Sequence, residues 1–151
     1  MTDMPLYLHF LFSFFATVGF AVFLNSPKSI LIHSGLVGGI GWVIFYYLVN
    51  LTSNDRLANF IASLFVSYIS EVLARKLKQP AIVFLIPGII PLVPGLGMYN
   101  TMLYLIQRDY INGIAKGVDV LFVAGAISLG ALVVSSLFKT IHIINLKKAA
   151  K

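Results

Sequence analysis

The stretch PAIVFLIPGIIPLVPGLGMYNTMLYLI, residues 80–106, decides how this chain folds. It is apolar enough to lie in a lipid bilayer, yet three prolines and three glycines interrupt its middle. A proline inside a helix removes a backbone hydrogen-bond donor and clashes with the preceding turn, which costs about 3 kcal/mol or more. Lipid offers the freed backbone groups no partner, so such a break persists only where protein or a watery cavity surrounds it. The interrupting residues are Pro87, Gly88, Pro91, Pro94, Gly95 and Gly97.

Transporters build binding sites near the middle of the membrane from discontinuous helices of this kind. Counting about 1.5 Å per helical residue from Pro80 places residues 88–94 near mid-bilayer. The helix that resumes at Gly95–Gly97 directs unpaired amides and partial positive charge at that depth, which suits a carboxylate. Asn100 and Thr101 follow within a turn and are predicted to complete a substrate-binding site. The alternative is a kinked helix whose prolines only shape packing.

The composition of the whole chain agrees with a membrane location. Of its 151 residues, 59% are hydrophobic and 11% are charged, whereas soluble domains carry about 25% charged residues. The sequence therefore predicts a single transmembrane domain, residues 1–151. The net charge of +6 would suggest a nucleic-acid partner in a soluble protein, but here the basic residues lie in short loops, where they orient the protein in the lipid bilayer. No nucleic-acid partner is expected.

Five stretches reach the roughly 20 apolar residues that a membrane-crossing helix needs. The fourth is longer than one straight crossing requires, which predicts two short helices joined by the Pro/Gly break. The predicted fold is an all-α bundle of five transmembrane helices with the fourth one broken. The expected spans are residues 6–24, 30–51, 57–74, 80–106 and 118–138, followed by a basic tail at 139–151.

The basic residues predict the orientation of these spans. With five crossings, eight Lys and Arg residues lie on one side and three on the other. Positive charge stays in the cytoplasm, so we expect an outside N-terminus and a cytoplasmic C-terminus in the cell membrane. A fourth segment that re-entered the same side would give six against five instead. The larger group is Lys28, Arg75, Lys76, Lys78, Lys139, Lys147, Lys148 and Lys151, and the smaller is Arg56, Arg108 and Lys116.

A polar stripe runs along the third span at helical spacing, so its residues share a face that turns away from lipid. Ser63 and Ser67 are predicted to line part of a substrate path, although serines also join helices without any transport role. Glu71 precedes Arg75 by four residues, the favourable order for a helical ion pair, and we expect that pair at the cytoplasmic end. The stripe consists of Asn59, Ser63, Ser67, Ser70 and Glu71.

Several other residues have expected structural roles. The glycine-rich run from Gly35 to Gly41 in the second span lets another backbone approach closely, as does the small face formed by Ala124, Ser128, Ala131 and Ser135 in the fifth. Whether the neighbour lies in this chain or another is open. Trp42 lies near mid-span and is expected to pack against a neighbouring helix. Asp119 is expected to begin the fifth helix, and His9 to lie at the membrane interface.

The sequence contains no HExxH, phosphate-binding loop, paired carboxylates or Ser/His/Asp arrangement. We therefore expect no enzyme activity, no catalytic residue, no metal and no cofactor. No Asp, Glu, Lys or Arg lies deep inside a predicted span, although ion-coupled carriers normally bury one. Five spans are also few for a solitary carrier, because many carriers pair two related bundles. The chain is thus expected to work in an assembly whose partner supplies the coupling group.

The run from Pro80 to Ile106, with its charged lead-in SEVLARKLKQP, resembles the proline-rich segment of the threonine/serine exporter (ThrE) family. The resemblance covers essentially the whole chain, with its specific part between Ser70 and Gln107. The length and the five spans without a soluble domain are similar to the separate small, YjjB-like subunit of two-component exporters. In that family the small subunit pairs with a larger ThrE-type, YjjP-like membrane subunit.

The resemblance implies a plasma-membrane exporter of small carboxylate metabolites, either threonine and serine or a succinate-like dicarboxylate. The chain is predicted to be the small membrane subunit of such an exporter, in a hetero-oligomer within the lipid bilayer. The backbone of Gly88–Gly97, with Asn100 and Thr101, would hold the substrate carboxylate. The alternative, from a different class, is a structural or assembly subunit that anchors a partner and never contacts substrate.

Overall fold

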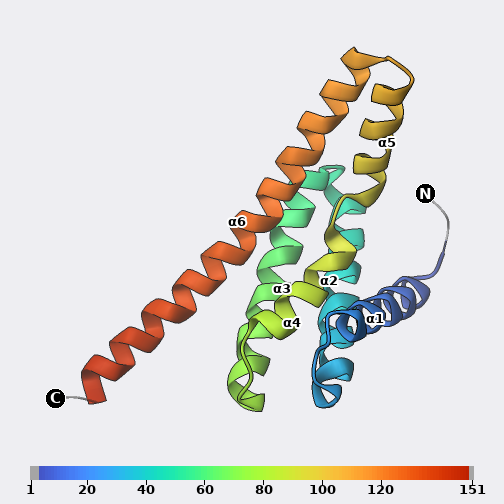
Figure 1. Ribbon diagram of the computed structural model, residues 1–151. Helices are drawn as coiled ribbons and strands as arrows, with labels where there is room; N and C mark the ends of the chain where they lie inside the picture. The colour runs from blue at the N-terminus through green and yellow to red at the C-terminus, as the bar shows by residue number, and fades with distance from the viewer. Residues whose placement is uncertain (1–3, 150–151) are drawn as a thin grey trace.

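The computed structural model describes residues 4–149, apart from the side chains of residues 142 and 145–149. Within that range every element is helical, as predicted (Figure 1). Four of these helices are long and apolar enough to cross a membrane, and a fifth span results if the two pieces of the broken segment count together. The elements are α1 (Leu6–Phe23), η1 (Lys28–Ile30), α2 (Leu31–Thr52), α3 (Asp55–Leu77), α4 (Ile82–Ile89), η2 (Ile90–Leu92), α5 (Gly95–Ile106) and α6 (Tyr110–Ala149).

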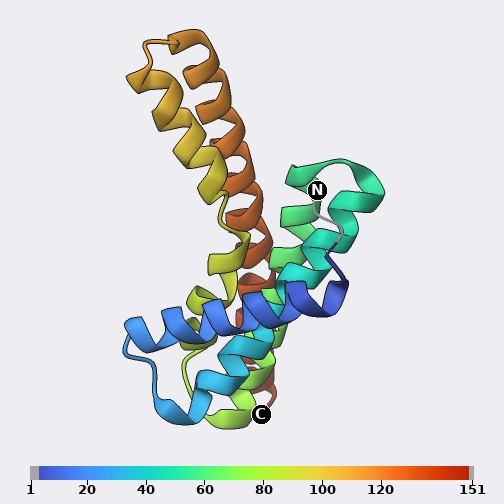
Figure 2. The same ribbon diagram turned by 90° about the vertical axis from the view of Figure 1, so that its right-hand side faces the viewer.

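The glycine-rich run of α2 packs against helices of this same chain. A side chain at Gly38 would overlap Thr17 of α1, and one at Gly41 would overlap Val66 of α3. The Ser13 hydroxyl of α1 donates a hydrogen bond to the Gly38 carbonyl at 3.1 Å, a distance that only close helix packing allows. The expected close approach is confirmed, and both neighbours lie within the chain. α1 crosses α2 obliquely in Figure 2.

α3 and α6 lie side by side and are joined near both ends. Arg56, in the first turn of α3, pairs with Asp119, while Arg75 near its other end donates to the Phe138 carbonyl at 3.2 Å. Both guanidinium groups also stack on phenylalanine rings of α6. The core between these ends consists of Val37, Ala62, Val66, Leu92, Val123 and Ile127.

The fourth segment is broken as predicted. Helical geometry ends at Leu92, Val93 is extended, and α5 begins after Pro94, with a bend of 55° between the two helical pieces. A bend of 55° leaves both pieces running toward the same end of the molecule, as Figure 1 shows. This direction supports a segment that crosses rather than one that returns to its starting side.

α6 is longer at both ends than the predicted fifth span. The expected loop at 107–117 is mostly helix, because Asp109 accepts a hydrogen bond from the Asn112 amide at 3.3 Å and starts α6 at Tyr110. Asp119 therefore does not begin the helix. The tail continues as helix to Ala149, and residues 150–151 lie outside the described residues.

One further expectation about side chains is wrong for the described part of the chain. Glu71 does not pair with Arg75, because the guanidinium of Arg75 is directed at α6 instead. In the small face of α6, Ala124 and Ser128 are exposed and Ala131 and Ser135 are half-buried. A close neighbour for this face in another chain stays a prediction.

α5 and the first part of α6 form a hairpin that projects beyond the turn between α2 and α3 (Figure 2). Leu105 of α5 packs at Gly113 of α6, and the Thr101 methyl group packs at Gly117. None of the residues of α5 is buried. The hairpin therefore stands away from the α1–α3 bundle and leaves space beside it.

Candidate functional site

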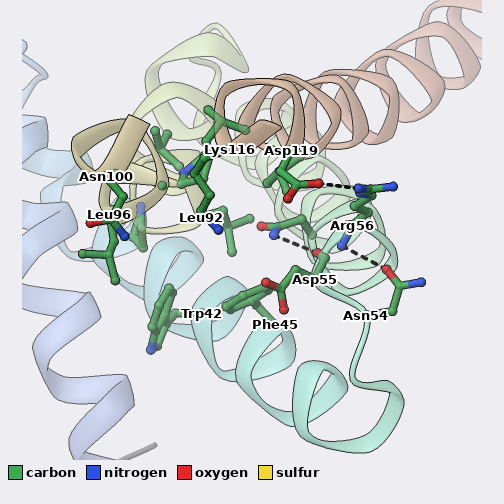
Figure 3. A pocket seen from close by; sticks show the side chains of 18 of the residues that line it. Trp42, Phe45, Asn54, Asp55, Arg56, Leu92, Leu96, Asn100, Lys116 and Asp119 are labelled. Atoms are coloured by element: carbon green, nitrogen blue, oxygen red, sulfur yellow. Dashed lines mark hydrogen bonds and ion pairs between the residues drawn. The ribbon is translucent and has the colours of Figure 1, made fainter. Parts of the chain in front are cut away.

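A cavity of about 820 Å³ opens between the projecting hairpin and the turn that joins α2 to α3. Figure 3 shows its labelled side chains around one space, with Lys116 and Asp119 of α6 facing Trp42 and Phe45 of α2. Residues of the helix break form another wall. The lining residues include Trp42, Phe45, Asp55, Arg56, Asn59, Pro91, Leu92, Pro94, Gly95, Leu96, Gly97, Asn100, Lys116, Asp119 and Val120.

One wall of the cavity is formed by the start of α5, which the sequence predicted as the carboxylate-binding helix end. Pro94 precedes the helix, and the amides of Leu96 and Gly97 belong to the first turn, which a helix leaves without intrahelical acceptors. Gly97 packs so closely on Val120 that a Cβ would lie 2.7 Å from the Val120 Cγ2 atom. Because Gly97 has no side chain, the positive N-terminal end of α5 can lie directly against α6.

Four charged residues line the cavity, two basic and two acidic. Arg56 pairs with Asp119, and its guanidinium carbon lies 4.8 Å from the centre of the Phe122 ring. Among the described side chains, neither Lys116 nor Asp55 forms an ion pair. The cavity therefore offers one positive and one negative group, at separate positions, with no protein partner of opposite charge.

Asn59 adds a buried acceptor to this lining. Its side-chain nitrogen donates to the Asp55 carbonyl at 2.9 Å, which fixes the amide. The residue is only 3% exposed, and its Oδ1 atom has no hydrogen-bond partner among the described residues. Leaving a buried acceptor unpaired costs about 1–3 kcal/mol, so a donor on a bound molecule would lower the energy of this site.

The structure brings together half of the residues predicted for the site. Pro91, Pro94, Gly95, Gly97 and Asn100 all line the cavity. Their role in binding stays a prediction, but their shared location makes a single site geometrically feasible.

The other predicted residues lie in packed regions outside the cavity lining. Gly88 packs between Val37 and Val66 near the middle of α3, and Pro87 beside it is fully buried. Thr101 donates to the Gly97 carbonyl at 2.8 Å and turns its methyl group to α6. Ser63 and Ser67 are fully buried, and Ser63 lies against Gly130 of α6.

Sequence reasoning missed Lys116, Asp119 and Arg56 as members of the site. Lys116 was assigned to a loop because the fifth helix was expected to begin two residues later. Arg56 and Asp119 are 63 residues apart, and no sequence pattern links them. A helix-start signal at Asp109, with an asparagine three residues later, would have placed Lys116 correctly on α6.

Comparison with known proteins supplies the family. The sequence pattern of the family described as "Threonine/Serine exporter, ThrE" matches residues 9–137, which is most of the chain. The chain belongs to the threonine/serine exporter family. This confirms the resemblance inferred from the broken segment. The apolar helices of the chain agree with the membrane location expected of this family.

Two curated relatives of this ThrE chain are longer than the chain itself. It is 24% identical to an uncharacterized protein of Haemophilus influenzae, with 85% of the chain and 46% of that protein covered. It is 29% identical to a threonine/serine exporter of Corynebacterium glutamicum, with 75% of the chain and 23% of that protein covered. The ThrE chain thus spans less than half the length of these relatives. No solved structure matches it.

Proposed function

We propose that this ThrE chain is the small membrane subunit of a two-component exporter of small carboxylate metabolites. The observation that carries the proposal is the cavity at the start of α5, where Lys116 and Asn100 lie beside free helix amides. A helix N-terminus and a nearby cation both favour a carboxylate. The cavity volume of about 820 Å³ is ample for a metabolite of a few carbon atoms.

The charges in the cavity favour an amino acid over a dicarboxylate. Two basic and two acidic residues line it, so its formal charge is zero. A zwitterion can place its carboxylate at Lys116 and its ammonium at Asp55 and the unpaired Asn59 oxygen. A succinate-like dianion would place its second carboxylate near Asp55, where like charges repel. Threonine or serine is therefore the proposed cargo class, and the relative from Corynebacterium glutamicum carries that name.

The proposed partner is a larger ThrE-type, YjjP-like membrane subunit in the plasma membrane. The chain matches 23% of the length of the Corynebacterium glutamicum exporter, and in this proposal the larger subunit corresponds to other parts of that relative. The side of α5 away from α6 has no buried residue and is available for such a partner.

The other candidate function is a structural or assembly subunit that never contacts substrate. One observation favours it: Gly88 packs against Val37 and Val66, and Pro87 beside it is fully buried rather than facing a cavity. Pro87 would then only shape packing. An exporter subunit must bind substrate in the cavity at Pro91–Asn100, whereas a structural subunit need not. Substitutions in that cavity therefore distinguish the two functions.

Export by cells that express the chain with its larger partner tests the proposal. We expect Asn100→Leu and Lys116→Ala each to reduce threonine export roughly ten- to hundredfold, since a hydrogen bond to a charged group contributes about 1.5–3 kcal/mol. The matched control is Thr101→Val, a change on the next residue of α5, whose side chain faces α6.

Membrane abundance of each variant must equal that of the wild type. If Asn100→Leu and Lys116→Ala export threonine at the full rate, the cavity is not the substrate site and the scaffold function is favoured. If succinate leaves the cells faster than threonine, and Asp55→Asn does not change that, the zwitterion assignment is wrong.

A further inference from the structure

A second cavity, of about 290 Å³, lies against α1, next to the first cavity. Trp42 and Pro91 line both cavities, so they form the wall between them. His9, in the first turn of α1, lines the smaller cavity on the side away from the charged residues. A change in the position of Trp42 would therefore alter the shape of both.

His9 and Trp42 are joined by a hydrogen bond that fixes the state of the histidine. The Trp42 Nε1–H group donates to His9 Nδ1 at 3.3 Å, and the His9 ring stacks on Tyr46 with 4.0 Å between ring centres. Because Nδ1 accepts, the neutral ring carries its proton on Nε2. That Nε2 atom is buried and has no hydrogen-bond partner among the described residues.

We propose that His9 is a proton-binding site whose charge sets the position of Trp42 at the wall of the substrate cavity. A protonated histidine carries N–H groups on both ring nitrogens and cannot accept from Trp42. The Tyr46 ring can still stabilise the cation through its π face, but the indole N–H must turn away. His9 acts on the cavity through Trp42 and is a positioning residue, not a substrate ligand.

Among residues 4–149, the helices packed on α1 carry no charged side chain next to His9. The elements that pack on α1 are α2, α4 and η2, and none of them contains Asp, Glu, Lys or Arg. Their titratable groups are Tyr46, which contacts the ring, with Tyr47 and His33 elsewhere on α2; Tyr7 lies on α1 itself. The charged residues of the larger cavity lie beyond Trp42.

The link to transport rests on the exporter function proposed above. Carriers that couple to protons contain a titratable group near the substrate path. The sequence suggested that a partner supplies this group, whereas His9 provides one within the chain, next to Trp42. Histidine ordinarily changes charge between about pH 5 and 8, which is the range in which the two sides of a cell membrane differ in proton concentration.

The chain offers a direct probe, because Trp42 is its single tryptophan and the chain has three histidines. We expect Trp42 fluorescence of the purified chain in lipid nanodiscs to show one sigmoidal transition with pH, because protonation of His9 removes the acceptor of the indole N–H group. His9→Asn keeps an acceptor near the indole but cannot be protonated, so the transition should vanish. The control His33→Asn/His142→Asn leaves His9 as the sole histidine and should keep the transition.

Two results would overturn the proton site: no transition in the wild type, or the same transition in His9→Asn. The circular dichroism of each variant must match the wild type, and Trp42→Phe checks that the signal comes from the indole. A second arm measures threonine export at external pH values from about 5.5 to 8, the range in which histidine titrates. His9→Asn should lose the pH dependence that the wild type shows.

The two arms separate failure of this inference from failure of the proposed function. If the fluorescence transition depends on His9 but the export pH profile of His9→Asn equals that of the wild type, control of the cavity by His9 is refuted. If no variant exports any metabolite, the exporter function and its link to His9 both fall, while the fluorescence alone decides the proton site.

Discussion

At the scale of single residues, the fold depends on positions where a side chain is missing. Gly38 is the clearest, because Thr17 of α1 occupies the space that a Cβ would need. Thr17 is fully buried, and its hydroxyl donates to the Ser13 carbonyl at 2.8 Å, so it cannot move aside without losing that bond. The contact between α1 and α2 is therefore rigid at this point.

Gly38→Ala is expected to destabilise the chain by about 1–3 kcal/mol, the usual cost of overpacking a filled contact. The control is Gly19→Ala, on the exposed side of α1, where a new Cβ meets no atom within 4 Å and the alanine favours the helix slightly. Unfolding by denaturant in detergent micelles measures both. Equal free energies of unfolding for the two variants would show that α1 and α2 are not packed as described.

Residue patterns predicted some of these contacts and not others. The glycine run of α2 indicated close packing, because glycine spacing on a helix is visible in one local stretch. The partner of Arg56 could not be predicted, since Asp119 lies 63 residues away and the pair is formed only by the fold. Arg75 likewise contacts Phe138 of α6 and not Glu71, which is nearer in the sequence.

At the scale of elements, the break between η2 and α5 is set by two prolines. Pro91 and Pro94 lack the amides that would continue the helix, and Val93 between them takes an extended conformation. The cavity exists because the bend of 55° swings α5 away from α2 and α3. If the segment were one straight helix, α5 would not diverge from α2 and α3, and we would expect no cavity between them.

Replacing both prolines tests this origin of the bend. A continuous helix from residue 82 to 106 would extend about 36 Å at 1.5 Å per residue. A bend of 55° between two equal halves of such a helix shortens that distance by roughly 4 Å. Pro91→Leu/Pro94→Leu should therefore lengthen the distance between spin labels at positions 82 and 106, and Pro80→Leu, which lies before α4, should not. An unchanged distance in the double variant would mean that tertiary contacts, not the prolines, hold the bend.

The sequence predicted this break well but placed the site less accurately. Proline and glycine act locally, so residues 87–97 identified the interruption and its exposed helix start. The depth of each residue depends on how the pieces pack. Gly88 lies in the packed middle beside Val66, while Gly97 lies beside Val120, close to the Arg56–Asp119 pair at the end of α3. Only the second half of the predicted site therefore borders a cavity.

At the scale of the whole molecule, α6 connects the two ends of the bundle. Its 40 residues extend about 60 Å at 1.5 Å per residue, twice the roughly 30 Å of a hydrocarbon core. The part that runs beside α3 lies between Asp119 and Phe138, which agrees with the span predicted at 118–138. In Figure 1 the hairpin before it extends past the α2–α3 turn, and the helical tail after it diverges to the side of α3 near its other end.

The basic residues lie in two groups, one at each end of the helix bundle. Lys28 precedes α2 and Lys78 follows α3, at the end where Arg75 meets α6, and Lys139 adjoins that contact. Arg56, Arg108 and Lys116 belong to the opposite end, with the cavity. Among the described side chains the basic residues thus divide between the two ends as the sequence predicted, and under the positive-inside rule the group with Arg75 and Lys78 is the one expected in the cytoplasm.

We expect a fluorescent protein fused after residue 151 to fold and fluoresce in cells, and alkaline phosphatase fused there to be inactive, because the positive-inside rule predicts a cytoplasmic C-terminus. Reporters in the loop at residues 107–109 should give the opposite result. The chain has no cysteine, so a cysteine at Arg108 should react with an impermeant thiol reagent from outside, and one at Lys78 should not. Reaction at Lys78 alone would reverse the orientation and place the cavity mouth in the cytoplasm. The cavity would then load substrate from the cytoplasm, and His9 beside Trp42 would respond to the cytoplasmic proton concentration instead of the external one.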